Sequence, residues 1–245
     1  VCEDVRLISA LREAHLEGGI TMSDRNLKVV AVINMVIAGT ATTSNSIIAY
    51  LNILCHHPEV QAKLQEEIDR VVGSEGSILL SNKESMPYTQ ATMLELLRYT
   101  SISPLGIPHL SNDDATIQGK RVPAGVPILT NLYALHHDES FWKDPFTFQP
   151  DRFLADTGQL VSASHPNRRH LMPFGAGPRV CLGEILAKSR LFLFISSLAQ
   201  NFNIRRGHIT ASDDPRLLLH GIVLSMPDYE IIAEDRTLSE VTTLL

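Results

Sequence analysis

Cysteine is scarce in this sequence, and the few cysteines present do not form pairs. Cys2, Cys55 and Cys181 are the only three in 245 residues and lie far apart. This spacing favours free thiols in a reducing compartment over a disulfide framework. No CxxC or HExxH pair occurs, so the sequence gives no indication of a zinc site.

An excess of basic residues is also absent. The formal net charge is −6, whereas a nucleic-acid-binding protein would need a basic stripe, so we expect no nucleic acid among the partners. The longest apolar run, residues 29–38, is interrupted by Asn34 and is too short to span a bilayer. There is no initiator Met and no signal peptide, and Val1 as the first residue leads us to expect that the sequence begins inside a longer protein.

What is present is a hydrophobic content of 44%, enough for a sizeable core in one large or two small domains. Helical periodicity dominates, with helices predicted at residues 24–56, 59–72 and 87–99 and after the last cysteine. Short strand signals occur at residues 115–117, 122, 126–129, 203–205, 221–224 and 229–233. The sequence therefore predicts a mainly α fold with small β-sheets, of the α+β class.

The chain is organised around residues 174–184, FGAGPRVCLGE. Gly177 and Gly183 allow turns and close approaches that a Cβ would block. The apolar residues that follow recur at helical spacing: Ile185, Leu186, Leu191, Phe192, Ile195 and Leu198. Cys181 is therefore predicted at the start of a long helix, where unpaired N–H groups and the helix dipole favour a thiolate, the form that binds iron.

A lone cysteine beside a turn would be interpreted as a buried structural residue. Here Phe, Gly, Arg, Cys and Gly occupy positions 174, 177, 179, 181 and 183, the pattern FxxGxRxCxG. This pattern resembles the haem-thiolate signature of the cytochrome P450 monooxygenases. The resemblance implies that Cys181 is the axial ligand of a haem b iron, and that Phe174, Gly175 and Gly183 contact the cofactor while Arg179 holds a propionate.

Residues 27–38 of the first predicted helix are apolar on nearly every face, so we expect this half of the helix to be buried all round. The remaining sequence offers few partners to cover it. This is a second indication that the chain is the C-terminal half of a catalytic domain, residues 1–245, with the N-terminal half and a membrane anchor lying outside it.

The segment AGTATT at residues 38–43 is, by itself, a weak turn of helix, because Gly is unfavourable there and hydroxyls can bend the helix. In the family, the segment [AG]-G-x-[DE]-T-[TS] lies over the haem, and its acid–threonine pair delivers protons to bound oxygen. The resemblance therefore makes Thr42 catalytic and places Ala38 against both cofactor and substrate. Ala41 replaces the acid, so either water and Thr42 suffice or turnover is slow and uncoupled.

Glu95 and Arg98 are three residues apart on a predicted helix and could form an ordinary surface pair. The resemblance adds Arg152 as a third member and implies a buried structural network that braces the cysteine loop. Such a network needs every member satisfied.

An extended segment rich in proline and glycine, residues 102–109, precedes the first strands. By resemblance it lines the substrate pocket, with His109 holding a haem propionate, and the turn at residues 221–223 makes a last substrate contact. The residues expected to face the substrate are Ala38, Ile102, Ser103, Ile107 and Ile222. This apolar wall suits a lipophilic molecule.

Residues 107–109, 131–137 and 191–194 look most like the microsomal branch that contains steroid 17α- and 21-hydroxylases. The resemblance implies a monooxygenase of the endoplasmic reticulum membrane, on its cytoplasmic face, which hydroxylates a lipophilic substrate such as a steroid. Electrons would come from NADPH through a flavoprotein reductase, with cytochrome b5 as a second candidate partner. A basic cluster could dock an acidic redox partner or simply be a solvated face; its members are Arg168, Arg169, His170, Lys188 and Arg190.

Three other interpretations remain open. The chain could be a truncated, catalytically inactive family member, which Val1 and Ala41 favour. It could be a xenobiotic-metabolising microsomal monooxygenase, because these share many of the same motifs. It could also be a haem-thiolate isomerase or dehydratase that needs no oxygen, which Ala41 permits.

Overall fold

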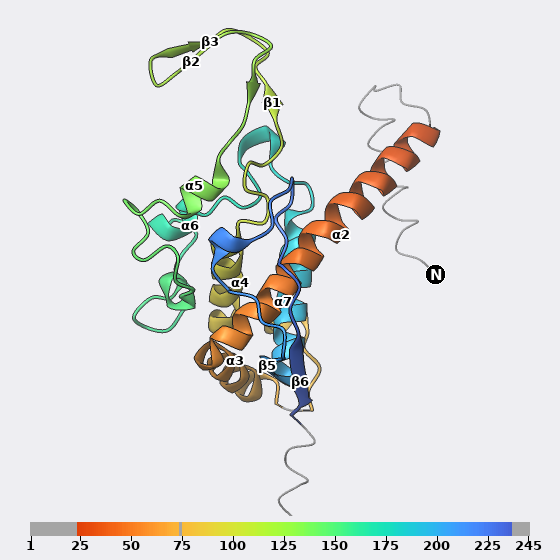
Figure 1. Cartoon of the computed structure of the whole chain (residues 1–245), viewed down its shortest axis with the longest axis vertical. Helices are drawn as coiled ribbons and strands as arrows, with labels where there is room; N and C mark the ends of the chain where they lie inside the picture. Colours follow the sequence, from red (N-terminus) through yellow and green to blue (C-terminus); the bar gives the residue numbers. More distant parts are fainter. Residues whose placement is uncertain (1–23, 74, 237–245) are drawn as a thin grey trace, which may run out of the picture. The chain divides into compact units, whose positions relative to one another are not determined.

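The structure is a computed structural model that describes residues 24–73 and 75–236 (Figure 1), with side chains described from Val36 onward. The chain divides into two units, residues 1–42 and residues 43–245. The first 23 residues, which include Cys2, lie outside the described residues.

Helix α2 spans Asp24–His56 and ends where the sequence predicts. It runs through Gly39 without a break, and the Thr42 hydroxyl donates a 2.7 Å hydrogen bond to the carbonyl of Ala38, the i−4 bond that a threonine in a helix favours. The prediction of all-round burial is wrong at Val36 and Ile37, which are 59% and 66% exposed. The reason is that α2 is the only described element of the first unit, so nothing described there covers these side chains.

The second unit has a helical core. Helices α3 (Pro58–Val71), α4 (Pro87–Thr100) and α7 (Glu184–Asn201) contact one another (Figure 1). The side chains at their centre have almost no exposed surface: Tyr50, Leu64, Ile68, Leu96, Phe192 and Ile195. Burying such apolar surface is the main favourable term in folding. In α4 twelve of the fourteen residues are buried, and they include polar and charged side chains as well as apolar ones.

Within the described residues, three antiparallel two-stranded sheets accompany the helices. Strand β1 (His109–Leu110) pairs with β4 (Pro127–Ile128), and β2 (Ala115–Ile117) pairs with β3 (Lys120–Val122). Strand β5 (Phe202–Arg206) pairs with β6 (Ile231–Asp235) near the end of the described chain (Figure 1). The mainly α fold with small sheets that the sequence predicts is therefore confirmed.

The strand predicted at residues 221–224 is not formed. Only an isolated bridge between Leu219 and Ser225 closes this segment into a loop, with the Leu219 and Ser225 amides and carbonyls bonded to each other. Residues 220–224 are thereby held in a tight turn, and a residue inside a turn cannot also pair along a strand.

Short helices that the sequence analysis did not predict shape the segment between α4 and the cysteine loop. They are α5 (Leu132–His136), the 3₁₀-helix η2 (Pro150–Phe153) and α6 (Pro166–His170). Trp142, 2% exposed, anchors the segment by donating from its indole nitrogen to the Leu135 carbonyl at 3.1 Å. In the described part of the chain, no helix combines the length and the apolar character needed to cross a membrane.

Candidate functional site

Backbone hydrogen bonds close the glycine-rich loop that precedes Cys181. The amide of Cys181 donates to the Phe174 carbonyl at 2.9 Å, and the amide of Gly175 donates to the Met172 carbonyl at 3.0 Å. Gly175 and Gly177 have φ values of 75° and 76°, a left-handed conformation that side-chain-bearing residues avoid. No atom lies within 4 Å of a Cβ built on either glycine, so the backbone conformation, and not a lack of space, requires glycine here.

Cys181 lies just before α7 rather than at its first residue, which corrects the predicted helix start. The helix begins at Glu184, whose amide donates to the Cys181 carbonyl at 3.3 Å. Gly183 is the cap residue, with an ordinary φ of −83°. A Cβ there would lie 3.8 Å from the Cys181 sulfur, a normal contact, so the expectation that Gly183 avoids a clash is not met within the chain itself.

The surroundings of Cys181 are exposed and apolar. The thiol is free and exposed, and its neighbours Leu182, Ile185 and Val180 are 95%, 82% and 43% exposed. Arg179, also exposed, ends the short 3₁₀-helix η3 (Gly177–Arg179). A soft sulfur donor, an apolar surface and a cation for a carboxylate are the groups that an iron porphyrin needs, so these residues fit a haem.

No cluster of three or more His, Cys, Asp or Glu side chains suited to a metal ion occurs in residues 24–73 and 75–236. A metal held by a porphyrin does not require one, because the ring supplies four ligands and the protein adds an axial one.

The structure brings Glu95, Arg98 and Arg152 together. Arg98 donates from Nε and Nη2 to the two oxygens of Glu95 at 2.8 and 2.7 Å, and Arg152 donates from Nε to Glu95 Oε1 at 3.2 Å. The amide of Gln149 adds a bond of 2.9 Å to the same oxygen. Glu95 and Arg98 have no exposed side-chain surface, so each buried charge depends on these partners.

The remaining donors of the two arginines bind backbone carbonyls. Arg98 Nη1 reaches the carbonyls of His136 and Pro145 at 2.8 and 2.9 Å. Arg152 donates to the carbonyls of Asp144, Thr147 and Lys143. The network thus ties α4 and η2 to the loop between α5 and η2, which the sequence pattern alone does not show.

The residues expected to face the substrate differ in how far their side chains are exposed. Ile107 and Ile222 are 75% and 88% exposed, whereas Ile102 is 8% exposed and Ser103 is half-buried. The amide of Leu224 donates to the Ile102 carbonyl at 2.8 Å, so the turn that carries Ile222 is held against the segment at residues 102–109.

His109 is exposed in β1, opposite Ile128. Ala38 and Thr42 belong to the first unit, where they share the hydrogen bond described above.

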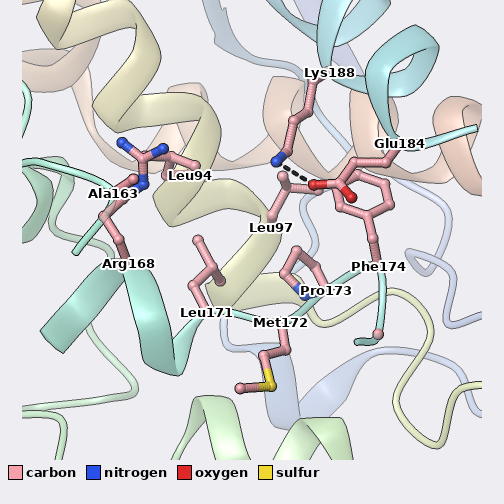
Figure 2. A pocket seen from close by; sticks show the side chains of 11 residues that line it. Leu94, Leu97, Ala163, Arg168, Leu171, Met172, Pro173, Phe174, Glu184 and Lys188 are labelled. Atoms are coloured by element: carbon pink, nitrogen blue, oxygen red, sulfur yellow. Dashed lines mark hydrogen bonds and ion pairs between the residues drawn. The ribbon is translucent and has the colours of Figure 1, made fainter. Parts of the chain in front are cut away.

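A pocket of about 200 Å³ lies between α4, the cysteine loop and the first turns of α7 (Figure 2). Lys188 and Glu184 form an ion pair at its rim, and Lys188 lies over the Phe174 ring at 5.4 Å from the ring centre. Arg168 donates to the Val161 carbonyl at 3.3 Å.

Of the five residues in the predicted basic cluster, Arg168 and Lys188 line this pocket. His170 stacks on Phe141, with ring centres 3.5 Å apart. Lys83, which the sequence analysis did not single out, belongs to the same basic surface. Burial lowers its pKa first, and the positive charges of Lys188 and Arg168 lower it further.

Comparison with known proteins agrees with this geometry. The profile of the family described as Cytochrome P450 matches residues 3–233. The chain is 40% identical over 205 residues to cytochrome P450 2U1 of Bos taurus, and the alignment covers 83% of this chain and 36% of that protein.

Other relatives are named steroid 17-alpha-hydroxylase/17,20 lyase. The protein from Squalus acanthias is 44% identical over 177 residues, covering 72% of this chain and 34% of the relative. The protein from Gallus gallus is 38% identical over 232 residues, covering 94% and 44%. The chain therefore spans about a third to somewhat less than half of the length of these curated relatives. Given the family match over nearly the whole chain and a free cysteine at the end of the FxxGxRxCxG loop, this chain belongs to the cytochrome P450 family.

Proposed function

We propose that this chain supplies the cysteine-ligand half of a haem-thiolate monooxygenase domain that inserts one oxygen atom of O₂ into a lipophilic substrate. The observation that carries the proposal is the exposed, free Cys181 at the end of a loop held by left-handed glycines and surrounded by exposed apolar side chains. Neither an ordinary structural cysteine nor a folded domain without a bound group gains from exposing such a surface.

Cys181 is the proposed axial ligand of a haem b iron. When bound, haem supplies the activation of dioxygen, and a thiolate ligand favours cleavage of the O–O bond. Around the ring we propose Phe174, Gly175, Gly183 and Ala38 as contacts. Arg179 and His109 are suited to the propionates because both are exposed and can donate hydrogen bonds to a carboxylate.

Thr42 is the proposed residue for holding a proton at its hydroxyl during the reaction, and this hydroxyl donates to the Ala38 carbonyl. A threonine hydroxyl can both donate a proton and accept one. Because Ala41 provides no carboxyl group beside it, water must replace the acid in proton transfer. This same feature favours the second candidate function, a haem-thiolate isomerase or dehydratase that consumes no oxygen.

For the substrate we propose a lipophilic molecule, with a steroid as the first candidate. The exposed Ile107 and Ile222 offer an apolar wall, and several relatives carry the name steroid 17-alpha-hydroxylase/17,20 lyase. An apolar wall of this kind does not distinguish a steroid from other lipophilic molecules, so a xenobiotic is the alternative substrate.

As partners we propose an NADPH-dependent reductase and cytochrome b5, with the whole protein on the cytoplasmic face of the endoplasmic reticulum membrane. The basic surface formed by Lys83, Arg168 and Lys188 supports docking of an acidic electron donor, since opposite charges speed encounter.

The proposal is tested by the carbon monoxide difference spectrum of the reduced, haem-loaded protein. We expect the strongly red-shifted Soret band of thiolate ligation, and its loss in Cys181→Ser. Cys55→Ser is the matched control, because Cys55 is also a free cysteine but is half-buried. An unaltered spectrum in Cys181→Ser would overturn the proposal. Feeding NADPH, reductase and candidate steroids then separates oxygen-dependent hydroxylation from rearrangement without oxygen.

A further inference from the structure

His136 is the one histidine of the described chain with no exposed surface, and it lies at the last residue of α5. Its ring joins two distant segments. Nε2 is 3.0 Å from the amide nitrogen of Met172, at the start of the cysteine loop, and Nδ1 is 2.8 Å from the hydroxyl of Ser101, at the end of α4.

The directions of these bonds fix where the ring proton lies. The Met172 amide can only donate, so Nε2 must be the unprotonated nitrogen, and Nδ1 therefore carries the proton and donates it to the Ser101 oxygen. The Ser101 hydroxyl in turn donates to the Arg98 carbonyl at 2.9 Å. Every donor in this chain has one acceptor, which requires a neutral imidazole in a single tautomer.

The neutral state agrees with the surroundings of the ring. Burial, and to a smaller extent the nearby His137 and Arg98, lower the pKa of His136 to about 3. Arg98 is held in place by Glu95 and donates to the His136 carbonyl, so both the ring and the backbone of His136 are tied to α4.

Ser101 shows that this arrangement is built at a conformational cost. Its φ of 40° and ψ of 50° place it in the left-handed region, which a serine avoids unless its surroundings hold it there. The hydrogen bonds that it makes to His136 and to Arg98 are the contacts that do so.

From Met172 the hydrogen bonds continue toward Cys181. The Met172 carbonyl accepts from Gly175, and the Phe174 carbonyl accepts from Cys181. Figure 2 shows Met172, Pro173 and Phe174 following one another along the wall of the pocket. Fixing the Met172 amide therefore fixes the residue from which the loop starts.

We propose that His136 is a positioning residue for the proposed iron ligand: its neutral ring anchors the start of the cysteine loop to the end of α4 and so determines where Cys181 lies. The effect on iron ligation rests on the proposed function. The anchoring of the loop by His136 does not, because it is a property of the chain without haem.

The first test is amide hydrogen exchange of the haem-free chain, measured by mass spectrometry on peptides covering residues 172–181. His136→Phe keeps a ring of similar size and removes both nitrogens. We expect the amides of Met172, Gly175 and Cys181 to exchange about tenfold faster, as when a buried hydrogen bond that holds a segment is lost.

His137→Phe is the matched control. His137 is adjacent, 6% exposed and also bonded through its ring, but to the carbonyls of Tyr133 and Tyr99. Its replacement should leave exchange of the loop at the wild-type rate. If His136→Phe does not fold, Ser101→Ala removes the acceptor of the ring proton and the hydrogen bond to the Arg98 carbonyl but keeps the ring nitrogen that accepts from Met172. The loop should then exchange about threefold faster.

The second readout is the carbon monoxide spectrum of the haem-loaded protein. The fraction with the thiolate band should fall in His136→Phe and stay unchanged in His137→Phe. Unchanged loop exchange, an equal rise in the control, or an equal thiolate fraction in the two variants would overturn the inference. Failure of the proposed function would be detected separately, as an unaltered spectrum in Cys181→Ser. The exchange experiment on the haem-free loop does not depend on iron, so its outcome is independent of that result.

Discussion

Arg98 is the largest fully buried side chain of the described residues, and each of its four hydrogen bonds ends on an oxygen of Glu95, His136 or Pro145. A guanidinium without exposed surface is tolerated only while all these acceptors remain. Among these partners Glu95 is the most important for stabilising the buried Arg98, because its carboxylate is the opposite charge for both Arg98 and Arg152.

Glu95→Gln should therefore lower the free energy of unfolding by about 3–5 kcal/mol, because it leaves buried positive charge without a partner. The measurement is urea unfolding followed by circular dichroism. Lys63→Ala is the control, since Lys63 pairs with Asp151 through exposed side chains and such pairs contribute about 0.2–1 kcal/mol. Equal losses in the two variants would contradict a structural role for the network.

Ala41 is the second residue at which a single change is informative. If proton transfer limits the proposed reaction, Ala41→Glu should raise the amount of product formed per NADPH, because a carboxyl beside Thr42 can pass protons to it. Product and peroxide are measured together in the reductase-supported reaction. Ala41→Gln, which has the same size but no titrating group, is the control, and an equal gain in both variants would exclude proton delivery as the cause.

At the scale of the elements, the junction between α2 and α3 is stabilised by hydrogen bonds to a loop that is distant in sequence, at residues 212–213. His57, the residue between the two helices, bonds Asp213 through Nε2 at 2.8 Å and Glu59 through Nδ1 at 3.1 Å. Asn52 adds a bond of 3.1 Å to the Ser212 carbonyl. The hydrogen bond to Asp213 is the main cause of the raised pKa of His57 and of the lowered pKa of Asp213.

This pair predicts a pH window for stability. The raised pKa of His57 stabilises the fold fully below the usual value of 6.5, and this contribution is lost as pH rises through the folded-state pKa. The lowered pKa of Asp213 contributes above the usual value of 3.8 and is lost as pH falls below it. The stability difference between wild type and Asp213→Asn should thus be largest between these two values and shrink toward pH 8. A difference that grows with pH would contradict this, and urea unfolding at several pH values measures it.

Elements with strong periodicity could be predicted from the sequence, and elements fixed by distant contacts could not. The ends of α2, α3 and α4 follow from apolar spacing and from Pro58 and Pro87. The start of α7 was predicted three residues early, because the apolar pattern continues through Cys181 while the Cys181 amide is taken by the Phe174 carbonyl.

The candidate site shows the same division. The motif residues around Cys181 could be recognised from their spacing alone. His136 could not be singled out, since nothing local distinguishes it from His137, and only the contact with Met172, 36 positions along the chain, gives its ring a distinct partner.

On the scale of the whole molecule, apolar side chains are exposed where the proposed cofactor and substrate would lie. Leu182, Ile185, Ile107 and Ile222 are each at least 75% exposed. Leu182 and Ile185 directly follow the loop that carries the proposed iron ligand, and large exposed apolar side chains at such a place are typical of a binding surface.

The double variant Leu182→Gln, Ile185→Gln should therefore change the free energy of unfolding of the haem-free chain by no more than about 0.5 kcal/mol, as for other exposed positions. It should weaken haem retention by about tenfold or more, since burial of two aliphatic side chains is lost from the complex. The control pair is Leu79→Gln, Ile209→Gln, at residues 57% and 53% exposed elsewhere in the chain. Transfer of haem to apomyoglobin measures retention, and equal transfer rates in the two pairs would contradict the assignment.

The two left-handed glycines of the cysteine loop have a consequence for chemical synthesis. Positive φ is the preferred region of residues with mirror-image chirality, and open space surrounds the position of a Cβ at Gly175 and Gly177. A D-alanine introduced by peptide ligation at either position would keep the native backbone path while reducing the freedom of the unfolded chain. The loop would become stiffer without any new contact, whereas L-alanine at the same position would have to bend it.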